Sequence, residues 1–230
     1  MKKIAALMRK EWLETRHITF GFLIAGLLFP LLRYGLGKYS YHGLRDVYYL
    51  SRDLPGHFVI FSLLNLGTLC AVAFSREREN GTETMMRRIN PDWRVAAATK
   101  FGYAFLTTLV LVLIFGLISM TFDWYARSPV GSSFLRFCCS WSTRASDAHS
   151  FAVLAAAACW GIFWTGRLRR RFDSVFLAFF TPTVLTIGVV WACYRLDWDN
   201  YAPTIIFNIV ACLLALIFAP FPRRFGYRQR

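Results

Sequence analysis

The residues with the clearest potential for chemistry lie in one charged segment between two long apolar runs, at positions 75–100. Its first third alternates acidic and basic side chains, and its 26 residues exceed what a simple connection between two helices needs. Carboxylate and guanidinium groups can pair with complementary charges on another molecule. The simplest alternative is a solvated loop that only carries positive charge. The segment is in either case long enough to fold.

Turn and helix signals follow each other inside this segment. Asn80 and Gly81 form a turn signal, and Thr82 is a candidate N-cap for a helix that follows it. Pro91 would end that helix, because the residue before a proline disfavours helical geometry. The apolar face of the helix would be formed by Met85, Met86 and Ile89. The pattern predicts a short, capped, amphipathic helix.

Elsewhere the sequence lacks the arrangements that catalysis or cofactor binding requires. It has no Gly-x-x-x-x-Gly-Lys-Ser/Thr phosphate loop, so ATP binding by this chain is not expected. Its four histidines have no ligand spacing, and its six cysteines match no zinc or disulfide framework. No carboxylate is evident inside an apolar run, which argues against an ion-coupled transporter. We expect no enzymatic activity, metal or cofactor in this chain.

The apolar runs around the charged segment predict an all-α membrane protein with a single domain over residues 1–230. Hydrophobic residues make up 56% of the chain, and six runs meet or approach the length of about 20 residues that a membrane-spanning helix needs. The six predicted spans are His17–Leu36, His57–Phe74, Phe101–Phe122, Ala148–Gly166, Val175–Tyr194 and Ala202–Phe221. A short external helix is also predicted over Leu44–Leu54.

The distribution of Lys and Arg predicts the orientation of these spans. The N-terminus, the second and fourth connections and the C-terminus together hold 19 of them, and the opposite side holds 8. Because positive charge is retained in the cytoplasm, both termini are expected there, in the inner membrane of a prokaryote. Topology and anionic lipid headgroups account for the net charge of +14, so nucleic acid is not an expected partner.

The first sixteen residues predict a helix that lies in the membrane interface. Ile4, Met8 and Trp12 recur at helical spacing, and the charged residues fall largely on the other side of the helical wheel. Trp12 would lie at headgroup depth, and the charged side would face anionic lipid or a protein partner. The alternative is a solvated terminus that only sets the topology.

A few polar residues inside the spans have two possible roles. They could line a transport path, or they could hydrogen-bond a neighbouring helix, which is the more common use of such residues in membranes. These residues are Ser62, Asn65, Thr68 and Asn208.

The order of residues in the charged segment resembles the signature of ABC type-2 permeases. In that family the loop after the second span carries an acidic residue, Gly-Thr, two large apolar residues, a proline and a lysine that opens the third span. The matching residues here are Arg76, Glu77, Arg78, Glu79, Asn80, Gly81, Thr82, Glu83, Met85, Met86, Pro91, Arg94 and Lys100. The interfacial N-terminal helix, six spans and cytoplasmic termini extend the resemblance to the whole chain.

This resemblance implies the permease subunit of an ATP-driven transporter, with export as the expected direction. Two such subunits, identical or related, would pair around the substrate path, and ATP and Mg²⁺ would bind in a separate cytoplasmic ATPase. The loop over residues 75–100 would carry the coupling helix, and Glu77, Glu79 and Glu83 would pair with basic groups of the ATPase. The connection over residues 195–201 is shorter than in several family members, so gate residues do not carry over.

Two other function classes stay open. A secondary transporter or channel would work without ATP and would depend on an ion gradient. A membrane scaffold would use the same charged segment to recruit a soluble partner without transporting anything.

Overall fold

The computed structural model describes residues 2–37, 44–81, 93–125, 145–196 and 201–219. Over these residues the regular structure is entirely helical, so the all-α prediction is confirmed there. The helices are α1 (Lys2–Gly37), α2 (Leu44–Val72), α3 (Ser75–Glu79), α5 (Trp93–Tyr125), α7 (Ala145–Thr165), α8 (Arg171–Arg195) and α9 (Tyr201–Ile217).

Each predicted span falls mainly within one of the six long helices. Three helices contain stretches that are long and apolar enough to cross a membrane, at Ile4–Leu32, Val95–Thr121 and Arg171–Arg195. In the other three the apolar helical stretches are shorter, and they cover Gly56–Val72, Ala152–Thr165 and Ala202–Ile217. The described helices therefore include three that can span a bilayer by length and composition.

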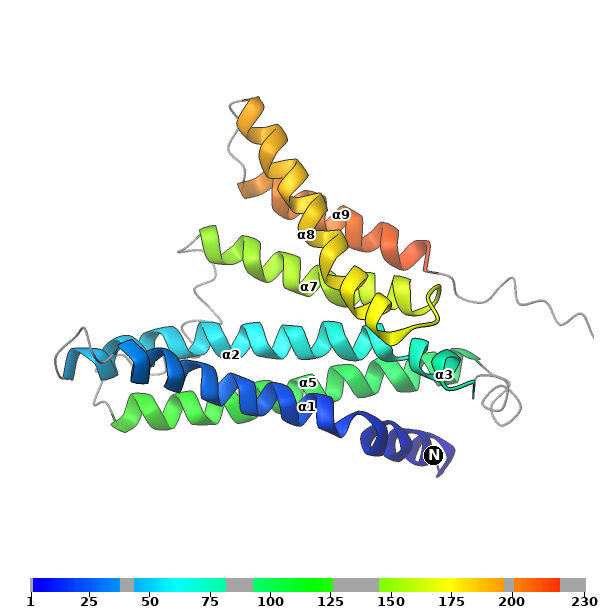
Figure 1. Cartoon of the computed structure of the whole chain (residues 1–230), viewed down its shortest axis with the longest axis horizontal. Helices are drawn as coiled ribbons and strands as arrows, with labels where there is room; N and C mark the ends of the chain where they lie inside the picture. The colour runs from blue at the N-terminus through cyan, green and yellow to red at the C-terminus, as the bar shows by residue number, and fades with distance from the viewer. Residues whose placement is uncertain (1, 38–43, 82–92, 126–144, 197–200, 220–230) are drawn as a thin grey trace, which may run out of the picture.

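Two predicted boundaries are wrong because the helices continue through them. Residues 2–16 and the first apolar run form the single helix α1, and the predicted external helix and second apolar run form the single helix α2. Around residue 16 there is neither proline nor glycine to end a helix, so the hydrogen-bond ladder continues. Figure 1 nevertheless shows the N-terminal part of α1 bent away from the line of the rest.

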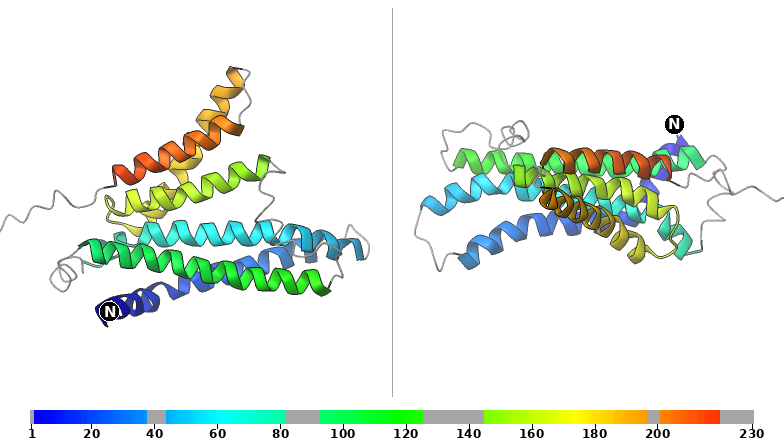
Figure 2. Two further views of the ribbon diagram at one scale, coloured as in Figure 1. Left: turned by 180° about the vertical axis from the view of Figure 1, so that it is seen from behind. Right: turned by 90° about the horizontal axis from the view of Figure 1, so that it is seen from above.

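The long helices form two groups that meet along α2 and α7 (Figures 1 and 2). In one group α1 and α5 pack on α2, and in the other α8 and α9 pack on α7. The rings of Phe58 and Phe115 stack at a centroid distance of 4.4 Å and form the centre of the core between α2 and α5.

Small residues allow α2 and α7 to approach closely. A Cβ atom at Gly161 would lie 2.9 Å from the backbone nitrogen of Ala71 and 3.0 Å from the carbonyl oxygen of Gly67. Any side chain at Gly161 would therefore push the two helices apart. This contact fixes the two helix groups against each other.

Large apolar side chains are exposed along α1, α5, α8 and α9. Among them, Leu117, Ile187 and Ile217 each leave more than half of their surface uncovered. So many exposed large apolar side chains are unusual for a protein surrounded by water, and they fit a lipid environment. The described part of the chain thus has the surface of a membrane protein.

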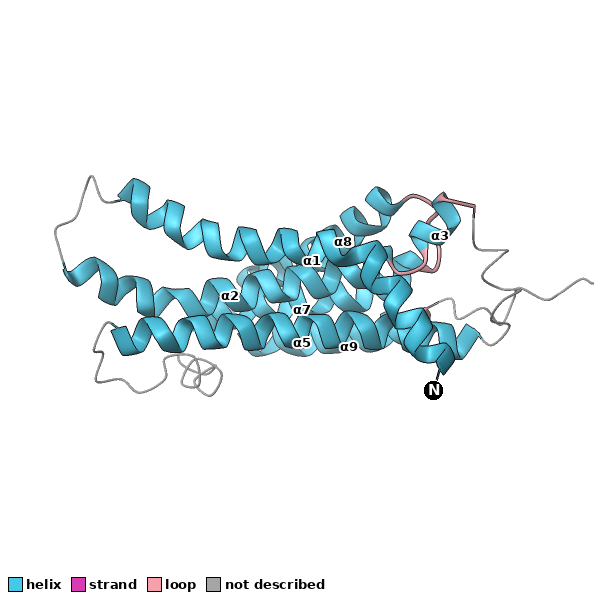
Figure 3. Ribbon diagram, turned by 90° about the horizontal axis from the view of Figure 1, so that it is seen from below, coloured by secondary structure: helices cyan, strands magenta, loops and turns pink. Residues whose placement is uncertain are grey.

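One end of the bundle, which we call the α3 end, gathers several segments that are far apart in sequence (Figure 3). The start of α1, helix α3, the start of α5 and the ends of α7 and α9 all lie there (Figures 1 and 2). The charged segment singled out in the sequence begins at this end.

Candidate functional site

The break between α2 and α3 is stabilised by side chains from other helices. Two residues separate the helices, and the carbonyl oxygen of Ala71 accepts hydrogen bonds from the hydroxyls of Ser75 (2.9 Å) and Ser174 (2.6 Å). The backbone N–H groups of Phe74 and Ser75 donate to Oγ1 of Thr165, at 2.9 and 3.0 Å. Because a helix break leaves backbone groups without partners, these side chains fix where α3 begins.

The other end of α3 is the turn predicted from the sequence. Asn80 follows the last helical residue, and its N–H donates to the carbonyl oxygen of Arg76 at 3.0 Å. Gly81 has a φ of 70° and donates to the carbonyl oxygen of Arg78 at 3.2 Å. Only glycine adopts this backbone conformation without strain, so Gly81 is required for the way in which α3 ends.

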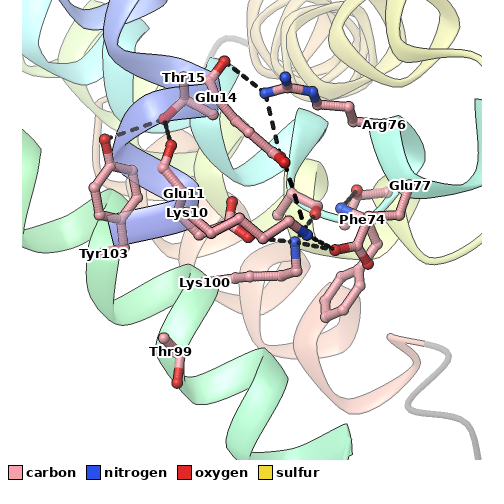
Figure 4. Close-up of polar contacts among 12 residues, drawn as sticks. Lys10, Glu11, Glu14, Thr15, Phe74, Arg76, Glu77, Thr99, Lys100 and Tyr103 are labelled. Carbon is pink, nitrogen blue, oxygen red and sulfur yellow. Dashed lines mark hydrogen bonds and ion pairs between the residues drawn. The ribbon is translucent and has the colours of Figure 1, made fainter. Parts of the chain in front are cut away.

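A buried lysine of α5 forms an ion pair with α3 on the side of α3 that faces the protein interior (Figure 4). Nζ of Lys100 lies 2.8 Å from Oε1 of Glu11, on α1, and 3.1 Å from Oε1 of Glu77, on α3. It also donates to the carbonyl oxygen of Ala73 at 2.7 Å and lies 5.2 Å from the ring centroid of Phe74. Lys100 is 5% exposed, so one ammonium group joins three helices in a site largely closed to water.

Further charged residues of α1 and α3 extend this site. Lys10 Nζ lies 3.0 Å from Oε1 of Glu77 and 3.8 Å from Oε1 of Glu14. Arg76 donates to the carbonyl oxygen of Glu14 at 2.6 Å and lies 3.6 Å from its carboxylate. We call these residues together the buried charge cluster, after its buried members Glu11, Glu77 and Lys100; the other members, Lys10, Glu14 and Arg76, are half-buried. Three cations face three carboxylates, so the cluster is balanced in charge.

A pair of hydroxyl groups next to the cluster fixes α1 against α5. The hydroxyls of Thr15 and Tyr103 lie 3.1 Å apart, and Thr15 also lies 2.7 Å from the carbonyl oxygen of Glu11 (Figure 4). Glu11 and Thr15 are four residues apart and therefore lie on the same face of α1. That face points into the protein, with both residues about 95% buried.

A second contact joins α3 to α8 at the surface. Oε2 of Glu79 accepts hydrogen bonds from Nε of Arg171 at 2.6 Å and from its backbone N–H at 3.3 Å. These two hydrogen bonds lower the pKa of Glu79 below its ordinary value. The side chains are 38% and 43% exposed, in contrast to the buried charge cluster.

The glutamates of α3 therefore bond to residues of the same chain, although the sequence predicted that they would contact an ATPase. Glu77 is 6% exposed and bonded to Lys10 and Lys100, so it does not present a free carboxylate to a partner. Lys100 was predicted to lie at the start of the third span, and it lies within α5, which begins at Trp93, about two turns earlier. Its burial follows from the need to neutralise two carboxylates inside the protein.

The remaining residues of the motif are only partly within the described structure. Arg78, Asn80 and Gly81 lie on or just after α3, and Arg94 is in the first turn of α5. The predicted capped helix falls outside the described residues, together with Thr82, Glu83, Met85, Met86 and Pro91.

The N-terminal part of α1 exposes apolar side chains and buries two polar ones, Glu11 and Thr15. Ile4 and Trp12 are 44% and 38% exposed, and Met8 is half-buried. Lys10 was expected to face headgroups or a partner, but it belongs to the buried charge cluster together with Glu14. Glu11 was not predicted as a functional residue. The pattern that could have identified it is its position four residues before Thr15, which places both residues on the inward face of α1.

The polar residues inside the apolar helices contact neighbouring backbones and helices. Asn65 Nδ2 donates to Thr108 Oγ1 at 3.0 Å and so joins α2 to α5. Asn208 Nδ2 donates to Thr186 Oγ1 at 3.1 Å and joins α9 to α8. Ser62 donates to a carbonyl oxygen one turn earlier in its own helix, and Thr68 is half-buried on α2.

The described charged residues at the α3 end attach helices to one another. Within the described ranges, no three His, Cys, Asp or Glu side chains are arranged to hold a metal ion. The buried charge cluster and the Glu79–Arg171 contact instead connect α3 to α1, α5 and α8. No protein-family model, curated protein or solved structure matches this chain.

Proposed function

We propose that this protein is the transmembrane permease subunit of an ATP-driven ABC type-2 exporter. In this proposal all six long helices cross the cytoplasmic membrane, and the α3 end faces the cytoplasm. Two permease subunits, identical or related, enclose the substrate path between them. A separate ATPase binds ATP and Mg²⁺ and contacts the segment over residues 76–100, beginning at α3.

The observation that supports this proposal best is the buried attachment of α3. A coupling element has to move together with the helices that it drives. Glu77 is bonded to Lys100 of α5 and Lys10 of α1, and breaking a buried ion pair by removing one partner costs about 3–5 kcal/mol. A displacement of α3 is therefore expected to move α1 and α5 while the ion pairs of the cluster remain intact.

The arrangement of the helices supports the orientation in this proposal. The start of α1 and the end of α9 lie at the α3 end, as an even number of crossings requires (Figure 1). The connections on that side are those that carry the excess of Lys and Arg in the sequence. Cytoplasmic placement of the α3 end follows from the retention of positive charge there.

The buried carboxylates bear on the alternative of an ion-coupled transporter. Such a protein needs a carboxylate that gains and loses a proton during transport. Glu11 and Glu77 are buried, but the ammonium groups of Lys10 and Lys100 compensate both of them. In this proposal the two carboxylates serve to attach α1, α3 and α5 to one another.

The proposal is tested by ATP hydrolysis in lipid. The protein is purified with the soluble nucleotide-binding protein of its native membrane, and the hydrolysis rate of the complex is compared between wild type and Gly81→Pro. Proline cannot adopt the φ of 70° at this position, so the end of α3 is disrupted. The control is Arg195→Gln, at the end of α8.

We expect hydrolysis to fall in Gly81→Pro and to stay unchanged in Arg195→Gln. Failure to recover any ATPase with the wild-type protein, or hydrolysis that is indifferent to Gly81→Pro, would contradict the proposal. Transport that persists without ATP and follows an ion gradient would instead favour a secondary transporter.

A further inference from the structure

Helix α3 is attached on two opposite faces. Glu77 and Glu79 are two positions apart, which on an α-helix places them about 200° apart around the axis. Glu77 accordingly contacts Lys10 and Lys100, on α1 and α5, while Glu79 contacts Arg171 at the start of α8. The order Glu-Arg-Glu in this short helix thus joins two sets of helices.

The second attachment reaches the other helix group. Helix α8 packs on α7, α9 and α2, whereas α1 and α5 pack on α2 from the first group. The first turn of α8 meets the α2–α3 region twice, through Arg171 on Glu79 and through Ser174 on the carbonyl oxygen of Ala71. A displacement of α3 can therefore act on α8 as well as on α1 and α5.

The two attachments differ in how easily they open. Lys100 and Glu77 have side chains only 5% and 7% exposed, whereas Arg171 and Glu79 are 43% and 38% exposed. Exposed ion pairs are weak and are screened by salt, while a buried pair that loses its partner is strongly destabilised. The contact with α8 is therefore the one that opens first.

We propose that Glu79 and Arg171 form a releasable contact that transmits the displacement of α3 to α8. Arg171 is then a positioning residue of the transport cycle, in addition to its role in topology. While the contact is closed, the first turn of α8 follows Glu79 of α3. When it opens, that side of α3 is released from α8, while Thr165 of α7 remains bonded to the α2–α3 junction. This inference rests on the proposed function, because it assigns to α3 the role of the coupling element.

Hydrogen exchange of the first turn of α8 tests whether the contact exists. The first N–H groups of a helix have no partner within that helix, so protection of the Arg171 amide depends on Glu79. The full chain in lipid nanodiscs is compared with Glu79→Ala, Arg171→Gln and the control Arg169→Gln, which removes an exposed charge nearby. Exchange is read by mass spectrometry on peptides covering residues 168–175.

We expect exchange at this turn to rise about two- to fivefold in Glu79→Ala, the range for an exposed ion pair. It should rise less in Arg171→Gln, which keeps the backbone bond, and remain unchanged in Arg169→Gln. High salt should reproduce the effect in the wild type without changing exchange around Lys100. Unchanged exchange in Glu79→Ala would overturn the inference, whether or not an ATPase is found.

The same readout in the complex with the ATPase tests transmission. In the wild type, addition of Mg-ATP should change exchange both around Lys100 and at the first turn of α8. In Glu79→Ala the change around Lys100 should remain and the change at α8 should disappear. A response at α8 that persists in Glu79→Ala overturns the inference and leaves the proposed function intact. If the wild type recovers no ATPase, the proposed function fails, and the assignment to a transport cycle fails with it.

Discussion

Replacement of Lys100 by methionine tests the buried charge cluster directly. Methionine keeps much of the length of the side chain but removes the ammonium group that bonds to Glu11, Glu77 and the carbonyl oxygen of Ala73. Two buried carboxylates are then left with the single ammonium group of Lys10. Removal of one partner from a buried ion pair costs about 3–5 kcal/mol, so we expect Lys100→Met to destabilise the protein by about 4 kcal/mol.

A compensated variant separates the loss of charge balance from the loss of side-chain packing. Lys100→Met combined with Glu11→Leu leaves Lys10 paired with Glu77, so no buried carboxylate lacks a cation. Because apolar replacement of a complete buried pair is often neutral, the double variant should regain most of the lost stability. Arg9→Met, an exposed change on the same helix as Glu11, should stay within about 0.5 kcal/mol of the wild type.

The free energy of unfolding is measured in mixed detergent micelles by tryptophan fluorescence. A Lys100→Met variant within about 1 kcal/mol of the wild type would contradict the assigned role of the ammonium group, because loss of a buried pair costs more than that. A double variant no more stable than Lys100→Met would contradict it as well. In that case packing of the lysine side chain, and not its charge, would stabilise the α3 end.

Three further predictions concern the attachments around α3. Thr165→Val removes the acceptor of two backbone N–H groups at the α2–α3 junction and should cost about 1–3 kcal/mol in unfolding free energy, whereas Thr165→Ser should retain most of the stability. Gly161→Ala brings a Cβ atom within 2.9 Å of the Ala71 backbone and should lower the melting temperature, whereas Gly188→Ala, with no atom within 4 Å, should not. The lowered pKa of Glu79 means that its contribution to stability is present above the unfolded-state pKa of about 4.3 and is lost as pH falls through the lower folded-state value. Protection of the first turn of α8, corrected for intrinsic exchange, should therefore persist at pH 5 and disappear only under stronger acid; loss already at pH 6 would contradict this assignment.

The helical architecture could be predicted because its signals are local. The apolar runs locate all six long helices, and Asn80-Gly81 correctly marks the turn that ends α3. Helix continuity was harder to predict, since the change from polar to apolar residues near position 16 indicates a change of environment and not a break in the backbone. Local signals can also mislead, because α2 continues through Pro55-Gly56, where the sequence predicted a boundary between two helices.

The pairing at the α3 end could not be predicted because it depends on contacts between distant residues. Lys100 and Glu11 are 89 positions apart, and neither alternating charge nor helical period identifies one as the partner of the other. The charged segment was correctly singled out as unusual, but its glutamates were assigned to an external partner. In the structure, Glu77 and Glu79 form ion pairs with Lys100 and Arg171 of the same chain.

The junction between α2 and α3 has a consequence for the biogenesis of the protein. The groups that complete it come from later parts of the chain, with Lys100 on α5, Thr165 on α7 and Ser174 on α8. During synthesis, α3 is made well before these residues, and its contacts are complete only once α8 has been made. The docking of α3 is therefore a late event in assembly, and a truncated or misinserted chain would lack a correctly formed α3 end.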